Sequence, residues 1–376
     1  MKRLSLIMAV AALACAAGAA PSASQPIGVF DSGIGGMTVL ERLLAADAFD
    51  NLTGEQIPDG KPDFSAESFV YFGDQANMPY GMYDAEGKAD FLRGLVVRDA
   101  RFVLGNEGHE PAKIVVIACN TATAYGLGEA TEAAKPHGVK VIGVVNAGVA
   151  AAMDDLNVKK GMPPFAIAVM ATPGTIASGA YQRTLRSAFA QRGIEGYEIV
   201  ARGGVGLAEA VENGDPLANE CARTNFTAMV RDYRARGGKL PIRAVILGCT
   251  HYPFVLDTFK GALAELRADP ACAALLADDF TFVDPAVYTA VQCFRSLRAD
   301  GLLNTGKKPP EKRVKPFVSV GVNGPLSHAE KYGRNVGQED VGTKIVPMGA
   351  GSVPDEALRR LRALLPVTAK ELFTDE

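Results

Sequence analysis

Short apolar runs recur along the chain, each followed by a glycine-rich or polar turn and then a helix-length stretch. Six such runs are evident, at residues 26–30, 68–72, 113–118, 140–145, 166–171 and 243–248. Short continuous runs rich in Val and Ile are typical of parallel strands that are covered on both faces. The pattern predicts an α/β fold with doubly wound parallel sheets, in which ligands bind beyond the carboxyl ends of the strands.

Two cysteine segments resemble each other. Residues 116–121 are Val-Ile-Ala-Cys-Asn-Thr, and residues 246–251 are Ile-Leu-Gly-Cys-Thr-His. Upstream of each lies another strand that ends in a hydroxyl and a glycine, at Asp-Ser-Gly (31–33) and Ala-Thr-Pro-Gly (171–174). Chance also produces such similarity between buried strands. The economical interpretation is two related, pseudo-symmetric α/β halves that face each other across an active-site cleft.

The length of 376 residues favours two domains. We expect a first α/β domain at residues 26–147 and 283–348, a second at residues 148–282, and a helical tail at residues 349–376. Two stretches rich in charged residues, Gly and Pro resemble insertions. Residues 50–66 predict a surface loop, and residues 304–315 predict an exposed connection.

Charge excludes some partners. The net charge is −3, with 22% charged residues and no cluster of Lys or Arg. This argues against a nucleic-acid footprint and against a polybasic membrane surface. Small charged metabolites remain as ligands.

The N-terminus predicts a secretory signal peptide at residues 1–19. Lys2 and Arg3 precede an apolar run at residues 4–14, and small residues before Ala20 suit cleavage after Ala19. The run is too short for a spanning helix of about 20 residues. We therefore expect export, to the periplasm, with no membrane span. Lipoprotein anchoring at Cys15 is the weaker alternative, and a leader that does not function would leave the protein cytoplasmic.

The six cysteines do not form a disulfide framework or a zinc motif. Removal of the leader leaves five, an odd number at wide spacing, with no Cys-x-x-Cys pair. Cys119 stands between a strand and the plausible helix start Asn120-Thr121, where the field of the helix N-terminus favours a thiolate. A small buried hydrophobe is the alternative interpretation of such a cysteine. Cys249 repeats the arrangement with His251, whose imidazole can share the thiol proton.

Other polar residues are weaker candidates. Asp31 and Asp74 end strands, where a carboxylate either caps the next turn or relays a proton to a facing thiol. The turn at Tyr80-Gly81 offers backbone N–H groups to an anion. Glu212 lies on an amphipathic helix, where a solvated carboxylate is the simpler interpretation.

The chain lacks the sequence motifs of several other enzyme classes. Thr38 stands where the dinucleotide fingerprint needs its third Gly or Ala. The chain has no Walker A sequence and no Gly-x-Ser-x-Gly elbow. The strand-end clusters contain no Lys for a pyridoxal Schiff base. They contain no Arg either, so a carboxylate ligand would be held by hydroxyls, amides and backbone N–H groups.

Four segments resemble, in the same order, the signature segments of glutamate racemases. They are Asp-Ser-Gly (31–33), Pro-Tyr-Gly (79–81), Ala-Cys-Asn-Thr-Ala-Thr (118–123) and Gly-Cys-Thr-His-Tyr-Pro (248–253). Residues 175–181, 211–214 and 317–321 also resemble family segments, within a similarity that runs from about residue 26 to residue 348.

The resemblance implies racemisation of glutamate by two bases without a cofactor or a metal. One cysteine thiolate takes the Cα proton, and the opposite thiol returns a proton to the other face. It implies Cys119 and Cys249 in these roles, Asp31 as the partner of Cys119, and His251 with Glu212 as the support of Cys249. The substrate contacts that it implies are Asp31, Ser32, Tyr80, Gly81, Asn120, Thr121, Thr250 and His251.

The chain departs from the family pattern in three places, namely the leader, the long segment 50–66, and Asn-Ala-Gly (146–148) where Pro-Gly is usual. Peptidoglycan precursors need D-glutamate in the cytoplasm, so an exported racemase would act on other pools. The change at residues 146–148 leaves aspartate or a broader amino-acid range open. A periplasmic amino-acid binding protein and a thiol hydrolase of related fold are further alternatives. A homodimer is left open by the sequence.

Overall fold

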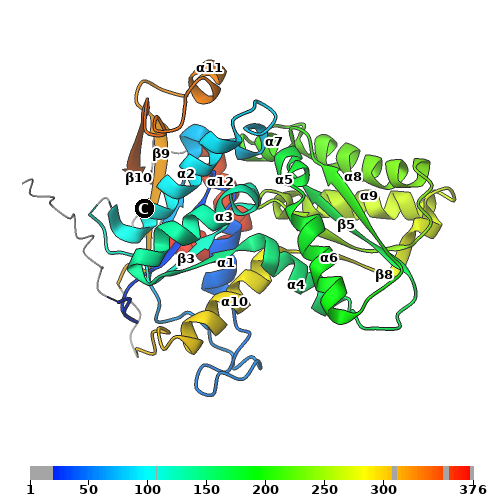
Figure 1. Ribbon diagram of the computed structural model, residues 1–376, viewed down its shortest axis with the longest axis horizontal. Helices are drawn as coiled ribbons and strands as arrows, with labels where there is room; N and C mark the ends of the chain where they lie inside the picture. The colour runs from blue at the N-terminus through cyan, green and yellow to red at the C-terminus, as the bar shows by residue number, and fades with distance from the viewer. Residues whose placement is uncertain (1–19, 107, 307–310, 350–354, 373–376) are drawn as a thin grey trace, which may run out of the picture.

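The computed structural model describes residues 20–106, 108–306, 311–349 and 355–372 (Figure 1). The predicted signal peptide, with Cys15 and the cleavage position at Ala19, lies outside these residues. None of the helices in the described ranges combines the length and the apolar character that a bilayer span requires.

Two sheets organise the described part of the chain, and the α/β class predicted from the sequence is confirmed. The six strands of the first sheet are β1 (Ile27–Asp31), β2 (Phe69–Gly73), β3 (Ile114–Ile117), β4 (Lys140–Gly143), β9 (Val314–Gly321) and β10 (Thr343–Pro347). The four strands of the second are β5 (Phe165–Ala171), β6 (Tyr197–Gly203), β7 (Ile242–Gly248) and β8 (Leu276–Val283). All pairings are parallel except that of β10 with β9.

The strand order repeats between the two sheets. The first sheet runs β10-β9-β2-β1-β3-β4, and the second runs β6-β5-β7-β8. The block β2-β1-β3-β4 therefore matches β6-β5-β7-β8, so that β3 corresponds to β7. The similarity between the two cysteine segments thus reflects two halves of the same topology. We call each sheet with its helices a lobe, and we propose that the domain boundaries follow the lobes, at residues 26–147 with 283–348 and at residues 148–282.

Helices cover both faces of each sheet, because the central strands are apolar on both sides. The longer helices are α1 (Met37–Ala45), α2 (Ala89–Arg101), α3 (Asn120–Ala134), α4 (Val144–Asp155), α6 (Ala180–Arg192), α8 (Ala218–Ala235), α9 (Leu256–Ala268), α10 (Pro285–Ala299) and α12 (Asp355–Leu364). The shorter ones are α5 (Pro173–Ala177), α7 (Leu207–Glu212), α11 (His328–Tyr332) and α13 (Pro366–Leu372). Single turns are η1 (Gln75–Asn77), η2 (Tyr80–Met82), η4 (Lys135–His137), η5 (Tyr252–Val255), η6 (Ala273–Leu275) and the π-helical η3 (Phe102–Asn106).

Four apolar cores follow from this layering. In the first lobe, α1 and α10 cover one face of the sheet and α2 and α3 cover the other (Figure 1). In the second lobe, α7, α8 and α9 cover one face, and α4 and α6 cover the other. The chain passes between the lobes twice, through α4 and before α10, and these two helices pack against each other.

The strands that the apolar pattern did not predict lie mostly at sheet edges. β6 and β8 are the edges of the second sheet, and β10 is an edge of the first. An edge strand is partly exposed, so charged residues such as Glu198 in β6 and Asp279 in β8 interrupt its apolar run. The predicted strand at residues 140–145 ends early, because Val144 already begins α4.

The predicted surface loop is partly wrong. Residues 46–68 form no helix or strand, and the side chain of Leu52 is exposed. Asp63 and Phe64 are buried, however, because Asp63 accepts hydrogen bonds from the N–H groups of Ala48 and Phe49 and the Phe64 ring packs edge-on against Phe294. The connection predicted at residues 304–315 is likewise shorter, because β9 begins at Val314.

Candidate active site

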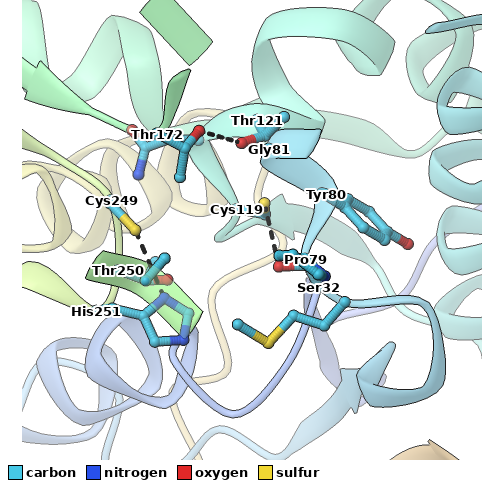
Figure 2. A pocket seen from close by; sticks show the side chains of 13 residues that line it. Ser32, Pro79, Tyr80, Gly81, Cys119, Thr121, Thr172, Cys249, Thr250 and His251 are labelled. Atoms are coloured by element: carbon cyan, nitrogen blue, oxygen red, sulfur yellow. Dashed lines mark hydrogen bonds between the residues drawn. The ribbon is translucent and has the colours of Figure 1, made fainter. Parts of the chain in front are cut away.

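Cys119 and Cys249 lie at the carboxyl ends of the equivalent strands β3 and β7 and line one cavity between the lobes. Figure 2 shows both sulfurs directed toward the same space. The cavity is lined by Ser32, Met78, Pro79, Tyr80, Gly81, Cys119, Asn120, Thr121, Thr172, Ala208, Cys249, Thr250 and His251. Its free volume is only about 20 Å³, roughly the space of one water molecule.

Cys119 itself caps α3. Its Sγ accepts the N–H of Ala122 at 3.4 Å, one residue before the predicted helix start at Asn120. The thiol S–H is directed at Ser32 Oγ, 3.7 Å away. Burial raises the pKa of Cys119, and the charge of Asp31 raises it further, more than the N–H of Ala122 lowers it. The expectation of a thiolate at this position is therefore wrong, because desolvation outweighs the field of the helix end.

Cys249 lies in a buried chain of three proton-carrying groups. Its Sγ is 3.5 Å from His251 Nδ1, and His251 Nε2 is 2.6 Å from Glu212 Oε2 at the end of α7. Burial alone would lower the pKa of His251, but the neighbouring Cys249 and Glu212 outweigh it and raise that pKa well above its ordinary value. The arrangement therefore favours a protonated imidazole, with Cys249 Sγ at one ring nitrogen and Glu212 Oε2 at the other.

The glycine-rich loop after β1 fits against this chain. A Cβ on Gly33 would lie 2.6 Å from Glu212 Oε1, and one on Gly35 would lie 2.6 Å from His251 Cε1. The N–H of Ile34 donates to Glu212 Oε1 at 3.0 Å. The absence of side chains at these glycines thus lets a loop of the first lobe contact the second lobe directly.

Asp31 lies behind the cavity wall at the start of this loop. Its Oδ2 accepts the N–H groups of Gly33 and Gly36, whereas Oδ1 has no hydrogen-bond partner among the described residues. Burial raises the pKa of Asp31 to about 6, although the charge of His251 and the two N–H groups lower it. Burial thus moves the pKa of Asp31 toward neutral pH. The hydrogen-bond partner of Cys119 is nevertheless Ser32 and not Asp31.

Three threonine hydroxyls form a cluster that joins the lobes. Thr121 on α3, Thr172 after β5 and Thr175 on α5 are each 2.9 Å from the other two. Beside them, Tyr181 donates to the amide oxygen of Asn120 at 2.6 Å. The segments 171–174 and 175–181 were noted in the sequence, but Thr172, Thr175 and Tyr181 were not named there as site residues. The signal for Thr172 was present, because it follows β5 as Ser32 follows β1 in the repeated topology.

Tyr80 and Gly81 contribute their backbone to the cavity. Figure 2 shows the Tyr80 ring directed away from the two sulfurs. A Cβ on Gly81 would lie 2.7 Å from the Cβ of Thr172, so this turn also contacts the second lobe. Asp74, considered as a proton relay, lies away from the thiols and binds Arg98. The unusual residues 146–148 lie in α4 and do not line the cavity.

The predicted site residues therefore gather at one place. Cys119, Cys249, His251, Ser32, Asn120, Thr121 and Thr250 line the cavity with their side chains or backbone, and Asp31 and Glu212 support the wall from behind. No Lys or Arg is among the lining residues. Within the described ranges, no group of three or more His, Cys, Asp or Glu side chains has the arrangement of a metal site.

Comparison with known proteins identifies relatives of this chain. Residues 66–277 match the model of the family Asp/Glu/hydantoin racemase. A glutamate racemase of Ruegeria sp. (strain TM1040) is 36% identical over 244 residues, 63% of this chain and 77% of the relative. A glutamate racemase of Lactobacillus helveticus is 31% identical over 282 residues, which are 75% of this chain and 84% of the relative. The crystal structure of a glutamate racemase from Francisella tularensis in complex with D-glutamate matches with a TM-score of 0.56 and 26% identity. The match covers 79% of this chain and 88% of that structure.

Proposed function

The chain belongs to the Asp/Glu/hydantoin racemase family, and on that premise we propose that it is a cofactor-independent glutamate racemase. The observation that carries the proposal is the pair Cys119 and Cys249, which end equivalent strands of two facing lobes and line one cavity. Binding alone needs no opposed acid and base, and a thiol hydrolase needs one activated cysteine rather than two.

The two thiols begin the reaction in different protonation states. Cys249 pairs with an imidazolium that Glu212 stabilises, so it is the thiolate that removes the Cα proton of one enantiomer. Cys119 keeps its proton because of burial and of Asp31. Its S–H delivers that proton to the opposite face of the carbanion, which leaves a thiolate at Cys119 and a thiol at Cys249. The other enantiomer reacts from this second state by the reverse transfers.

The substrate carboxylates are held without a cationic side chain from Lys or Arg. The available donors are the hydroxyls of Ser32, Thr121, Thr172 and Thr250 and the amide of Asn120, all on residues that line the cavity. The N-terminus of α3, which begins at Asn120, adds backbone N–H groups beside them. Hydroxyl groups rotate, so the three clustered threonines can exchange mutual hydrogen bonds for bonds to a carboxylate.

Substrate entry requires the lobes to separate. A volume of about 20 Å³ does not accommodate glutamate. The contacts that must yield are those of Gly81 with Thr172 and of the Gly33–Gly35 loop with Glu212 and His251. Closure over the substrate then excludes water from the thiols, which strengthens the electrostatic interactions in the site.

Incubation with L- and D-glutamate in deuterated water tests the proposal. Chiral chromatography with mass detection should show interconversion, with one deuterium at Cα of the product. L- and D-aspartate, run in parallel, define the substrate range. Binding of glutamate without interconversion and without deuterium uptake would refute the racemase assignment and leave a binding protein.

Export is a separate part of the proposal. The basic start, the apolar run at residues 4–14 and the small residues before Ala20 support cleavage after Ala19 and a periplasmic racemase that acts on pools other than peptidoglycan precursors. N-terminal sequencing of the native protein tests this. An intact Met1 in a cytosolic fraction would contradict export and restore the cytoplasmic, cell-wall role.

A further inference from the structure

A buried polar network lies behind Tyr80, on the side of the turn that faces away from the cysteines. Its centre consists of Asp74 after β2, Arg98 and Asp99 on α2, and the Tyr80 hydroxyl. Asp74, Asp99 and Tyr80 are at most 1% exposed. The racemisation steps use none of these side chains.

Asp74 is the fully ionised member of the network. It accepts hydrogen bonds from Asn77 and Ser319, at 2.8 Å and 2.6 Å, and forms an ion pair with Arg98 at 2.6 Å. Burial raises the pKa of Asp74, but Arg98 and these donors outweigh it and hold that pKa below its ordinary value. Arg98 also donates two hydrogen bonds to Asp99 Oδ1, at 2.7 Å and 3.1 Å, so one buried cation lies between two carboxyl groups.

The contacts of the Tyr80 hydroxyl indicate the protonation state of Asp99. Its oxygen lies 2.6 Å from Asp74 Oδ2 and 2.6 Å from Asp99 Oδ2. A phenol has one proton and donates to only one of these oxygens. If both carboxyls were ionised, the other oxygen would face the phenol oxygen across 2.6 Å with no hydrogen between them. A proton on Asp99 Oδ2 removes this conflict, because Asp99 then donates to Tyr80 and Tyr80 donates to Asp74.

We propose that Asp99 is a neutral carboxylic acid that acts as a positioning residue, holding Tyr80 so that the Tyr80–Gly81 backbone keeps its place in the substrate cavity. The proposal rests on the proposed function. It assigns Asp99 no contact with substrate; Asp99 acts through Tyr80, whose ring connects the network to the cavity wall.

The electrostatic surroundings agree with a neutral acid. Burial raises the pKa of Asp99 to about 8, and the charge of Asp74 raises it against the opposing effect of Arg98. The titratable and charged groups around this pair, on all the elements packed against it, are Asp74, Tyr80, Tyr83, Arg98, Lys331, Arg334 and Asp340. Arg334 binds Asn77 and Lys331 donates to the carbonyl of Met78, so both cations are satisfied elsewhere.

The turn that the network holds is a contact point between the lobes. Gly81 lies against Thr172, and a Cβ on Gly174 would lie 2.7 Å from the carbonyl oxygen of Gly81. A small displacement of Tyr80 therefore moves a backbone segment that has no free space on the cavity side. Ionisation of Asp99 would set two buried carboxylates against one phenol and should release Tyr80.

The kinetic test compares wild type with Asp99→Asn across pH 6 to 9.5. Asparagine offers one donor and one acceptor, as the protonated acid does, so kcat and KM at pH 7 should stay within about twofold. In wild type, KM for glutamate should rise with a midpoint of about 8, reaching about tenfold at one unit above it, because only the protonated form binds well. Asp99→Asn should lack this rise. Asp90→Asn, on the exposed side of α2, is the matched control and should keep it.

Two measurements test the proton without activity. Infrared spectra of wild type should contain a buried carboxylic-acid band that titrates with a midpoint of about 8 and is absent from Asp99→Asn. The folded state should hold a proton that the unfolded chain releases, so wild-type stability should fall as pH rises from about 4 to about 8. The melting temperature of Asp99→Asn relative to wild type should therefore increase over that range and then level off.

The outcomes separate the two proposals. A wild-type protein that does not racemise glutamate but shows the infrared band refutes the proposed function and leaves the proton assignment standing. If Asp99→Asn folds poorly, the wild-type infrared titration still decides, and a missing band overturns the neutral acid. A racemase in which Asp99→Asn keeps the wild-type pH dependence of KM overturns the positioning role, because a purely structural residue would change stability alone.

Discussion

Replacement of Glu212 by Gln isolates the charge that supports the His251–Cys249 pair. Glu212 Oε2 is 2.6 Å from His251 Nε2, and both side chains are almost fully buried. Glutamine keeps the volume and still accepts the N–H of Ile34, which Glu212 Oε1 accepts in wild type at 3.0 Å. The substitution therefore removes a carboxylate charge and leaves the contact between the lobes.

The magnitude follows from the type of bond. A charge-assisted hydrogen bond in a buried site is worth about 1.5–3 kcal/mol, and each 1.4 kcal/mol is about tenfold in rate. We expect kcat/KM to fall by about 10- to 100-fold. The fall must be equal in both directions, because the two enantiomers have equal free energy. Glu212 helps to raise the pKa of His251, so that pKa should be lower in the variant. The loss of activity at alkaline pH should therefore begin at a lower pH in the variant than in wild type.

Racemisation is followed by circular dichroism of glutamate from each enantiomer, across pH. Glu209→Gln is the matched control, because Glu209 lies on the same helix but is exposed. Activity of Glu212→Gln within twofold of wild type, or an equal loss in Glu209→Gln, would refute the role given to the His251–Glu212 pair.

Three further predictions concern the thiols and Asp31. Cys119→Ser and Cys249→Ser should each lower the rate of racemisation by at least about 10³-fold, since a serine hydroxyl is too weak a base. The control Cys221→Ser changes a half-buried thiol outside the cavity and should keep its activity. Activity in either cavity variant would contradict the two-base mechanism. The pKa of Asp31 is about 6 in the folded state, against an ordinary value of 3.8. A shift of about two pKa units corresponds to about 3 kcal/mol of folding stability. This contribution is fully present below about pH 4 and is lost as the pH rises through about 6. Denaturant unfolding of Asp31→Asn should lack this slope, and an unchanged slope would assign the proton elsewhere. Mild peroxide should inactivate the enzyme, reductant should restore it, and glutamate should protect it; peptide mapping should show that lost activity follows sulfenic acid at Cys119 or Cys249 rather than at the more accessible Cys221.

Local patterns were sufficient for the central strands and for the two thiols. β1, β3, β5 and β7 are buried on both faces, so their apolar runs are continuous and the polar residues after them are evident in the sequence. The edge strands β6, β8 and β10 were not predicted, because partly exposed strands contain charged residues that interrupt the apolar pattern. A sequence pattern reflects burial, and edges are where burial is incomplete.

The protonation of the site belongs to the tertiary structure. The sequence places Cys119 before a helix, which alone favours a thiolate, but burial and the approach of Asp31 reverse that preference. Asp99 gave no sequence signal, since an aspartate within a helix is ordinarily solvated, and only the fold brings it to the Tyr80 hydroxyl.

The sequence by itself thus determined the α/β class, the two related halves and which thiols end equivalent strands, because these depend on the local order of apolar and polar residues. Only the tertiary structure decided which thiol holds a proton, how Glu212 and the Gly33–Gly35 loop join the lobes, and what lies behind Tyr80. The physical reason is that desolvation and charge interaction depend on distances between groups far apart in the chain, such as the 178 positions between Ile34 and Glu212.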